Sequence, residues 1–150
     1  MTVRIFVVVG VLALTLSACS TLPFGSSGDS SDDLPTPAEA MEQAGLELPA
    51  GAQDVTITSK ELPDRAHAWA VTFTAERADA EALCEPMGGA GHQSFVPKMH
   101  QELLGDDVQA SQQTRGCSAS TGNGGLWGRF VLIDPGDPAV VHVSLQQLTR

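Results

Sequence analysis

Two apolar segments near the C-terminus constrain the fold of this chain most strongly. Trp127–Ile133 and Ala139–Leu148 are rich in Val, Leu and Phe, and a turn spanning Asp134–Pro138 separates them. Apolar segments on either side of a turn made of Asp, Pro and Gly predict a β-hairpin. If the strands keep the simplest pairing, one shared set of side chains faces the core. That set is Phe130, Leu132, Val141, Val143 and Leu145.

Two more strands are expected earlier in the chain. Val55–Thr58 alternates apolar and polar residues, as does His67–Thr74. In the second segment the alternate positions carry His67, Trp69, Val71 and Phe73. This alternation is typical of strands that bury one face.

A first helix is expected over Pro37–Ala44. Thr36 precedes it as an N-cap, and Glu39 stands three residues later, which makes a capping box. Gly45 follows the apolar positions and is expected to end the helix.

A second helix is expected over Glu76–Cys84, with Thr74 as a plausible cap, and a third short one around Lys98–Leu104. The rest of Ala90–Gly125 shows no clear period and is expected to be irregular. The order of elements predicts the α+β class. We expect an antiparallel sheet of about four strands, with two or three short helices on one face.

Composition limits the possible partners. The 150 residues include 18 acidic and 8 basic side chains, so the formal net charge is −10. There is no Tyr, and there are only two Trp and five Phe. A chain with this charge lacks the basic surface and the stacking platforms that nucleic-acid binding needs. Its length fits one ordinary domain.

The N-terminus carries the features of an export signal. Arg4 precedes an apolar run, Ile5–Ala18, that is shorter than the about 20 residues needed to cross a bilayer. The run ends in Leu16-Ser17-Ala18-Cys19, an aliphatic residue and two small residues before a Cys. This tetrapeptide resembles the lipobox of bacterial lipoproteins.

The resemblance implies a defined modification. The Cys19 thiol would carry diacylglycerol, and a signal peptidase would cut between Ala18 and Cys19, so residues 1–18 are interpreted as a signal peptide. Several acyl chains hold a protein on a membrane far more firmly than one. The alternatives are an ordinary secretory signal with an unrelated Cys, or a single uncleaved anchor.

Residues 19–34 are expected to be a flexible tether between the lipidated Cys19 and the folded part. Ser, Gly and Asp dominate this stretch, which has no apolar period. A chain of this kind reaches roughly 20–25 Å. The single α+β domain is therefore expected over residues 35–150.

Cys84 and Cys117 remain once Cys19 is assigned to the anchor. An even number of cysteines in an exported chain favours a disulfide, which here would close a loop of about 34 residues. The alternatives are two free buried thiols, or a redox or metal-binding pair, although no CxxC spacing is present.

The chain carries no familiar catalytic motif, and we expect no catalytic residue, no metal site and no cofactor. His92 and His100, with Met87 and Met99, are candidate ligands for a soft metal, but solvent-facing positions explain them as well. His67 and His142 could meet across the sheet. Paired acids could act in a glycosidase, but Asp is also common in turns. A glycine-rich loop could bind phosphate, but it could equally be a flexible loop. The acid pairs and the loop are Asp32/Asp33, Asp106/Asp107, Asp134/Asp137 and Gly122-Asn123-Gly124-Gly125.

The expected second helix has an acidic outer face. This face is either a solubilising surface or a docking face for a basic partner. Its acids are Glu76, Asp79, Glu81 and Glu85.

The chain as a whole resembles small exported lipoproteins of high-GC bacteria, particularly the actinobacterial kind. The resemblance rests on the lipobox, on the tether, on the preference for Arg over Lys and on Ala44–Val55, which is similar to a stretch of uncharacterised members. It implies a location outside the cytoplasm, on the plasma membrane.

Three functional hypotheses follow. The leading one is a non-enzymatic binding or interaction module, anchored to the membrane through Cys19, with an envelope protein, a cell-wall polymer or a small ligand as its partner. The second is a transport or assembly accessory, which needs an apolar cavity of at least about 300 Å³. The third is a minor hydrolase, which needs a cleft with a His or carboxylate beside a nucleophile or water.

Overall fold

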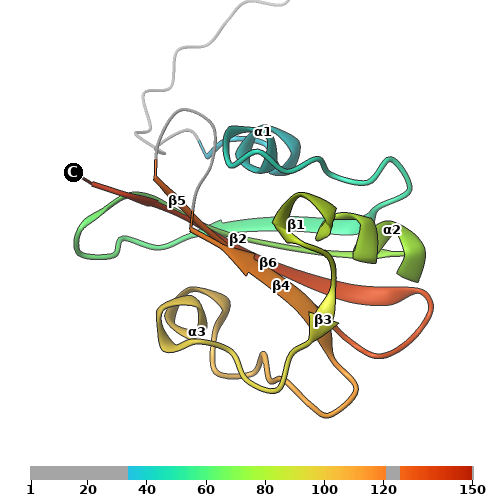
Figure 1. The fold of residues 1–150 in the computed structure, drawn as a ribbon. Coiled ribbons are helices and arrows are strands. Elements are labelled where there is room, and N and C mark those ends of the chain that lie inside the picture. The colour runs from blue at the N-terminus through green and yellow to red at the C-terminus, as the bar shows by residue number, and fades with distance from the viewer. Residues whose placement is uncertain (1–33, 121–125, 150) are drawn as a thin grey trace, which may run out of the picture. The chain divides into compact units, whose positions relative to one another are not determined.

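One antiparallel sheet forms the centre of the fold. The computed structural model describes residues 34–120 and 126–149, and within them six strands pair in the order β1-β2-β6-β5-β4-β3 (Figure 1). The strands are β1 (Gln53–Ser59), β2 (Arg65–Ala75), β3 (Gly91–His92), β4 (Arg115–Ala119), β5 (Trp127–Ile133) and β6 (Ala139–Leu148). The α+β class and the antiparallel sheet are thus confirmed.

The expected number of strands was wrong. Strands β3 and β4 lie within Ala90–Gly125, which was expected to be irregular. Strand β4 has the sequence Arg-Gly-Cys-Ser-Ala, whose small side chains give no apolar alternation. It forms because β5 offers it a free edge, with Cys117 opposite Val131. A strand that forms mainly because it pairs with a neighbouring strand is hard to recognise from its own sequence.

The pairing of β5 with β6 differs from the simplest alternation. Val131 stands opposite Val143, and Leu132 stands opposite His142. Side chains directly opposite each other in a sheet share a face. Phe130 and Leu132 therefore face away from Val141, Val143 and Leu145, and the expected shared set was wrong. All seven residues of β5 are nevertheless buried, because both faces of the sheet are covered.

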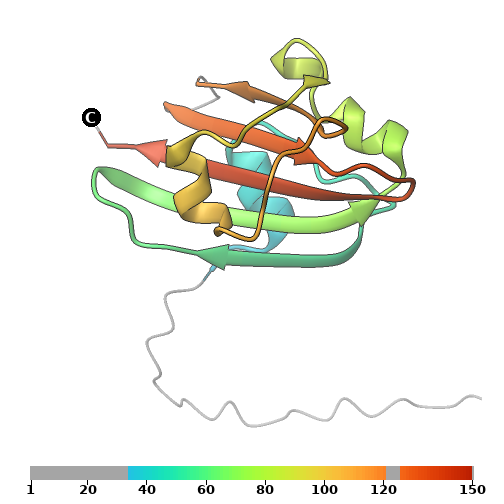
Figure 2. The same ribbon diagram turned by 90° about the horizontal axis from the view of Figure 1, so that it is seen from below.

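Helices cover both faces of the sheet, contrary to the expected single face (Figures 1 and 2). Helices α1 (Pro37–Gln43) and α2 (Arg77–Ala82) and the short 3₁₀ helix η1 (Glu85–Met87) lie on one face. Helix α3 (Lys98–Leu104) lies on the other. The larger core, on the α1 side, has as its biggest fully buried apolar members Met41, Val71, Phe73, Val131, Ile133, Val141, Val143 and Leu145.

The face under α3 holds two smaller clusters. Leu103 packs with Ala68 and Ala70, and Val108 packs with Phe130 and Leu132. The small alanines let α3 approach β2 closely. Apolar side chains on both sides of the central hairpin thus require a helix or loop on each face.

The ends of α1 follow the sequence signals. The Thr36 hydroxyl accepts a hydrogen bond from the Glu39 backbone N–H, and the Glu39 carboxylate accepts one from the Thr36 backbone N–H at 2.8 Å. Gly45 has a φ of 72°, and the Leu46 N–H donates to the Met41 carbonyl at 2.9 Å. This is the Schellman arrangement that a glycine in the left-handed region permits. The predicted capping box and helix end are confirmed.

Gly116 provides a test of the β4–β5 pairing. A Cβ at Gly116 would collide with the Val131 carbonyl oxygen, whereas a Cβ at its β3 partner Gly91 would meet nothing within 4 Å. We expect Gly116→Ala to lower the free energy of unfolding by about 1–3 kcal/mol. Gly91→Ala should stay within about 0.5 kcal/mol of the wild type. Urea unfolding measures both, and equal effects would contradict the pairing.

Candidate functional site

A groove opens between the α1 segment and the α2 segment on one side of the sheet. Its volume is about 1020 Å³. Three stretches of chain line it, in α1, in the connection after α1, and in α2 with the start of η1. The lining residues are Ala38, Glu42, Gly45, Leu46, Glu47, Leu48, Pro49, Ala50, Gly51, Asp79, Ala82, Leu83, Glu85 and Pro86. The groove is therefore built from segments far apart in the sequence.

The wall on the α1 side is held by packing and by one buried cation. Met41 and Leu46 are buried in the larger core, so hydrophobic packing attaches α1 and the start of its connection to the sheet. Arg129 lies on β5, and its Nη1 donates a hydrogen bond to the carbonyl of Ala44, which follows α1, at 3.3 Å. A cation at this place stabilises the unpaired carbonyls at the end of a helix.

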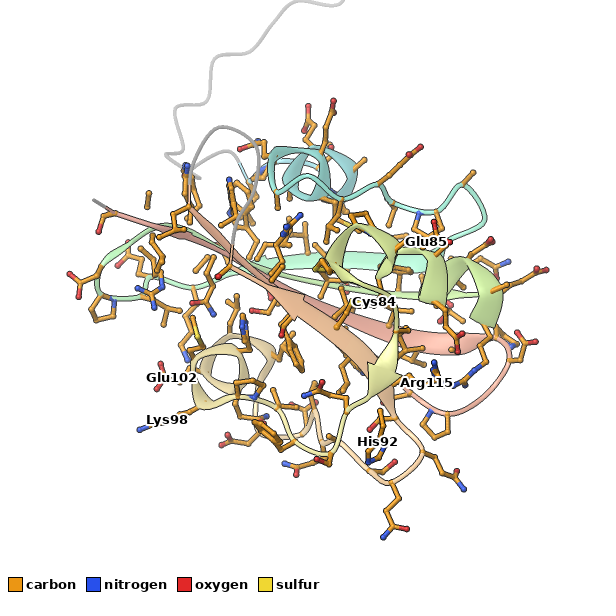
Figure 3. All side chains as sticks on the ribbon, viewed as in Figure 1. Cys84, Glu85, His92, Lys98, Glu102 and Arg115 are labelled. Carbon is orange, nitrogen blue, oxygen red and sulfur yellow. A yellow bond between two sulfur atoms is a disulfide. The ribbon has the colours of Figure 1, made fainter. Side chains whose placement is uncertain are left out.

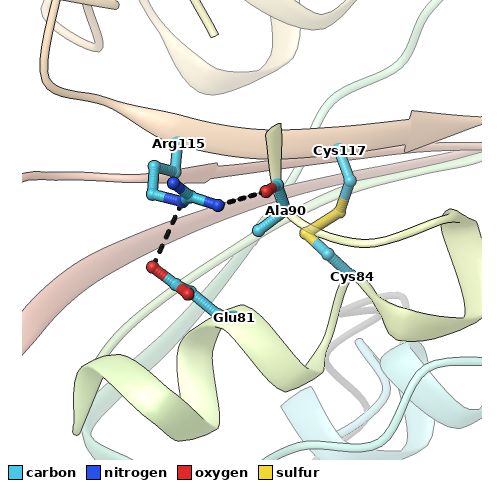
Figure 4. Close-up of a disulfide and its surroundings, with 5 residues drawn as sticks. All are labelled: Glu81, Cys84, Ala90, Arg115 and Cys117. Atoms are coloured by element: carbon cyan, nitrogen blue, oxygen red, sulfur yellow. Dashed lines mark hydrogen bonds and ion pairs between the residues drawn. A yellow bond between two sulfur atoms is a disulfide. The ribbon is translucent and has the colours of Figure 1, made fainter. Parts of the chain in front are cut away.

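The wall on the α2 side is held by the disulfide between Cys84 and Cys117 (Figure 4). The two Cα atoms lie 5.6 Å apart, and both cysteines are buried. The predicted disulfide is confirmed. Cys84 stands between the groove residues Leu83 and Glu85, so the bond ties this wall directly to β4.

Charged side chains reinforce that attachment. The Glu81 carboxylate lies 3.2 Å from Nε of Arg115 on β4 and 3.1 Å from Nε of Arg77. Arg115 also donates to the Ala90 carbonyl (Figure 4). The carboxylate of Asp137, in the β5–β6 turn, accepts a hydrogen bond from the Arg77 backbone N–H at 3.0 Å. Asp137 thus caps α2, and the expected Thr74 cap and Glu76 start were wrong.

All the charged side chains that line the groove are acidic. Glu42, Glu47, Asp79 and Glu85 line it, and no Lys, Arg or His does. Within residues 34–120 and 126–149, none of these four carboxylates takes part in an ion pair. Figure 3 shows Glu85 on the α2 side of the sheet, away from Lys98 and Glu102 on α3. The groove lining thus combines apolar side chains with acids that have no ion-pair partner among the described residues.

The acidic face predicted for the second helix is therefore divided between two roles. Glu81 is bound by two arginines, whereas Asp79 and Glu85 line the groove. Sequence reasoning missed Glu42 and Glu47, which join them from the α1 side. In the sequence these two residues are simply acids on either side of Gly45, where α1 ends. No local pattern indicates that they lie near α2.

Removing the disulfide should weaken the α2 wall. We expect Cys84→Ala/Cys117→Ala to lower the free energy of unfolding by roughly 3–4 kcal/mol, because the link closes a long loop in the unfolded chain. Hydrogen exchange should rise more at residues 82–87 than in α3. A reductant should reproduce this change in the wild type and have no effect on the double variant. An unchanged stability of the reduced wild type would contradict the structural role.

Several predicted features lie outside the described residues. These are the Ala18–Cys19 cleavage site with its lipidated Cys19, the acids Asp32/Asp33 and the loop Gly122-Asn123-Gly124-Gly125. Among the residues that the structure describes, no helix is long and apolar enough to cross a membrane.

The histidines singled out as metal ligands lie in different surroundings. His92 is exposed on β3, whereas His100 is a buried residue of α3 and stacks on Phe130 of β5 with ring centroids 5.0 Å apart. Over the described ranges, no three His, Cys, Asp or Glu side chains are grouped so that they could hold a metal ion.

His67 and His142 do not meet. His67 stacks on Trp69, and its register partner is Gln147 at the far end of β6. His142 stands opposite Thr72, and its Nε2 lies 3.2 Å from the Asp134 carboxylate. Strand alternation places the two imidazoles on opposite faces of the sheet.

A buried polar network runs under α3. Nδ1 of His100 lies 2.9 Å from Oγ of Ser144, and Gln146 donates to the Met99 carbonyl at 2.7 Å. Nε of Arg65 donates to Oε1 of Gln146 at 3.0 Å. The network satisfies polar groups that strand β6 directs into the interior.

His100 and Ser144 are close enough to act as a general base and a nucleophile, but a substrate could not reach them. Ser144 is fully buried and His100 is 5% exposed. Burial, with a smaller contribution from the Arg65 guanidinium, lowers the pKa of His100 to about 4. A hydrolase needs such a pair in a cleft that substrate can reach. This pair joins α3 to the sheet.

The buried His100 should make folding stability depend on pH. The unfolded chain binds a proton near pH 6.5, whereas the folded chain binds it near pH 4. Stability is therefore lost as pH falls through this window, by up to about 3 kcal/mol. We expect His100→Gln to have a flatter pH profile of unfolding free energy than the wild type. His92→Gln, at an exposed position, should keep the wild-type slope, and parallel profiles for all three would refute the assignment.

Comparison with protein-family models, with curated proteins and with solved structures finds no match for this chain.

Proposed function

We propose that this chain is an extracytoplasmic lipoprotein, anchored to the plasma membrane through Cys19, and that its folded part is a non-enzymatic binding module of the cell envelope. The groove between α1 and α2 is its binding surface in this proposal. The observation that carries the binding role is that four carboxylates, which form no ion pair among the described residues, line one groove together with apolar residues. Groups of this kind favour a partner that neutralises them.

The anchor is supported by the order of the N-terminal features. A basic residue, an apolar run, the sequence Leu16-Ser17-Ala18-Cys19 and a polar tether follow one another before the first helix. The disulfide between Cys84 and Cys117 agrees with an oxidising compartment, since disulfides persist mainly outside the cytoplasm.

The groove favours a binding module over the two other hypotheses. A protein that carries an apolar ligand encloses it in an apolar cavity. The groove between α1 and α2 is instead open to solvent and is lined partly by acids. The space between the sheet and α1 is filled by fully buried side chains such as Met41 and Phe73. The buried position of Ser144 argues against hydrolysis at the His100 pair.

Membrane fractionation tests the anchor. Cys19→Ala should release the protein from the membrane fraction or leave an uncleaved precursor, because the alanine cannot accept a lipid. Ser20→Ala keeps the thiol and should behave as the wild type. Mass spectrometry of the mature N-terminus should find a lipid-modified Cys19. Unchanged processing and membrane retention of Cys19→Ala would overturn the proposal.

A further inference from the structure

We infer that the groove binds an extended segment of a partner protein that carries several lysine or arginine side chains. This inference rests on the proposed binding role and names the class of partner. The described lining consists of four carboxylates together with alanine, glycine, leucine and proline. Charge complementarity therefore favours a cationic occupant.

The spacing of the carboxylates favours a ligand with separated charges. Glu42 and Glu47 belong to α1 and its connection, whereas Asp79 and Glu85 belong to the α2 side. No three of them converge as metal ligands do. A single compact cation could neutralise only part of this set. Successive basic side chains of a peptide can reach both walls.

The apolar part of the groove lining suits the methylene stems of those side chains. Leu46, Leu48 and Leu83 belong to the lining, and of these Leu48 is the more exposed. Lys and Arg bury their methylene stems on such surface while the charged end stays hydrated. The apolar lining thus adds contact area, and the carboxylates bind the charged ends.

The walls are already held in place, so the occupant need not order them. The disulfide at Cys84 and the Glu81–Arg115 ion pair fix the α2 side. A Cβ placed on Gly51 would lie only 3.9 Å from Oδ2 of Asp79, so the two walls approach each other there. A preformed site reduces the entropy lost on binding.

A titration with the full chain in detergent tests this inference. The probe is a fluorescent peptide that alternates lysine with alanine, and anisotropy reports its binding at low salt and at about 0.15 M salt. The first variant is Glu42→Gln/Glu47→Gln/Asp79→Asn/Glu85→Gln. The matched control is Glu61→Gln/Glu102→Gln/Asp106→Asn/Asp107→Asn, which removes the same charge from exposed positions outside the groove.

We expect the groove variant to raise the Kd at least about tenfold and the control to change it less than about twofold. A photoreactive group on the peptide should label residues 38–51 and 79–86. Thermal melting of both variants establishes that they remain folded.

Four outcomes would overturn the inference: no binding by the wild type, equal weakening by both variants, equal binding of a peptide with glutamate in place of lysine, or displacement of the peptide by spermidine at equal charge concentration. The last result would assign the groove to a small polyamine. Since the titration is done in detergent, it does not depend on the modification of Cys19. Failure of anchoring and failure of peptide binding are therefore separate results.

Discussion

The burial of β5 on both of its faces is the constraint on which the rest of this fold depends. Its residues alternate between the α1 face and the α3 face, and all of them are excluded from solvent. A strand of this kind needs a neighbour on each edge and cover on each side. Strands β4 and β6 supply the edges, and the helices supply the cover.

The two sides of the sheet then serve different purposes. Under α3, small alanines and a buried polar network join the helix to the sheet, with His100 neutral among them at physiological pH. On the opposite side, two separate helical segments share one face, and the seam between them remains open as the groove. Hydrophobic burial and the Arg129 hydrogen bond hold α1 there, whereas the disulfide at Cys84 and the Glu81–Arg115 ion pair join the α2 segment to β4. Among the described residues, the four acids that line this groove form no ion pair.

Local signals predicted much of the secondary structure. The strands β5 and β6 and the helix α3 begin and end where the pattern placed them, and Thr36, Glu39 and Gly45 delimit α1 as expected. These features depend on residues within one or two turns of each other. The two-residue strand β3 and the small-residue strand β4 were missed because pairing with a neighbour creates them. The α2 cap was missed for the same reason, since Asp137 reaches it from the β5–β6 turn.

By itself, the sequence predicted the α+β class and most element positions, because periodicity and capping residues are properties of the linear chain. It favoured a Cys84–Cys117 bond only once Cys19 was interpreted as the anchor, and the tertiary structure decided the pairing by bringing the two residues together. Only the tertiary structure decided which side of the sheet each residue faces, since a shift of one residue in register exchanges the two faces. It also decided that Glu42 and Glu47 line the same groove as Asp79 and Glu85. No local pattern encodes that proximity, because it arises where two helices that the β1–β2 hairpin separates in the sequence lie on the same face of the sheet.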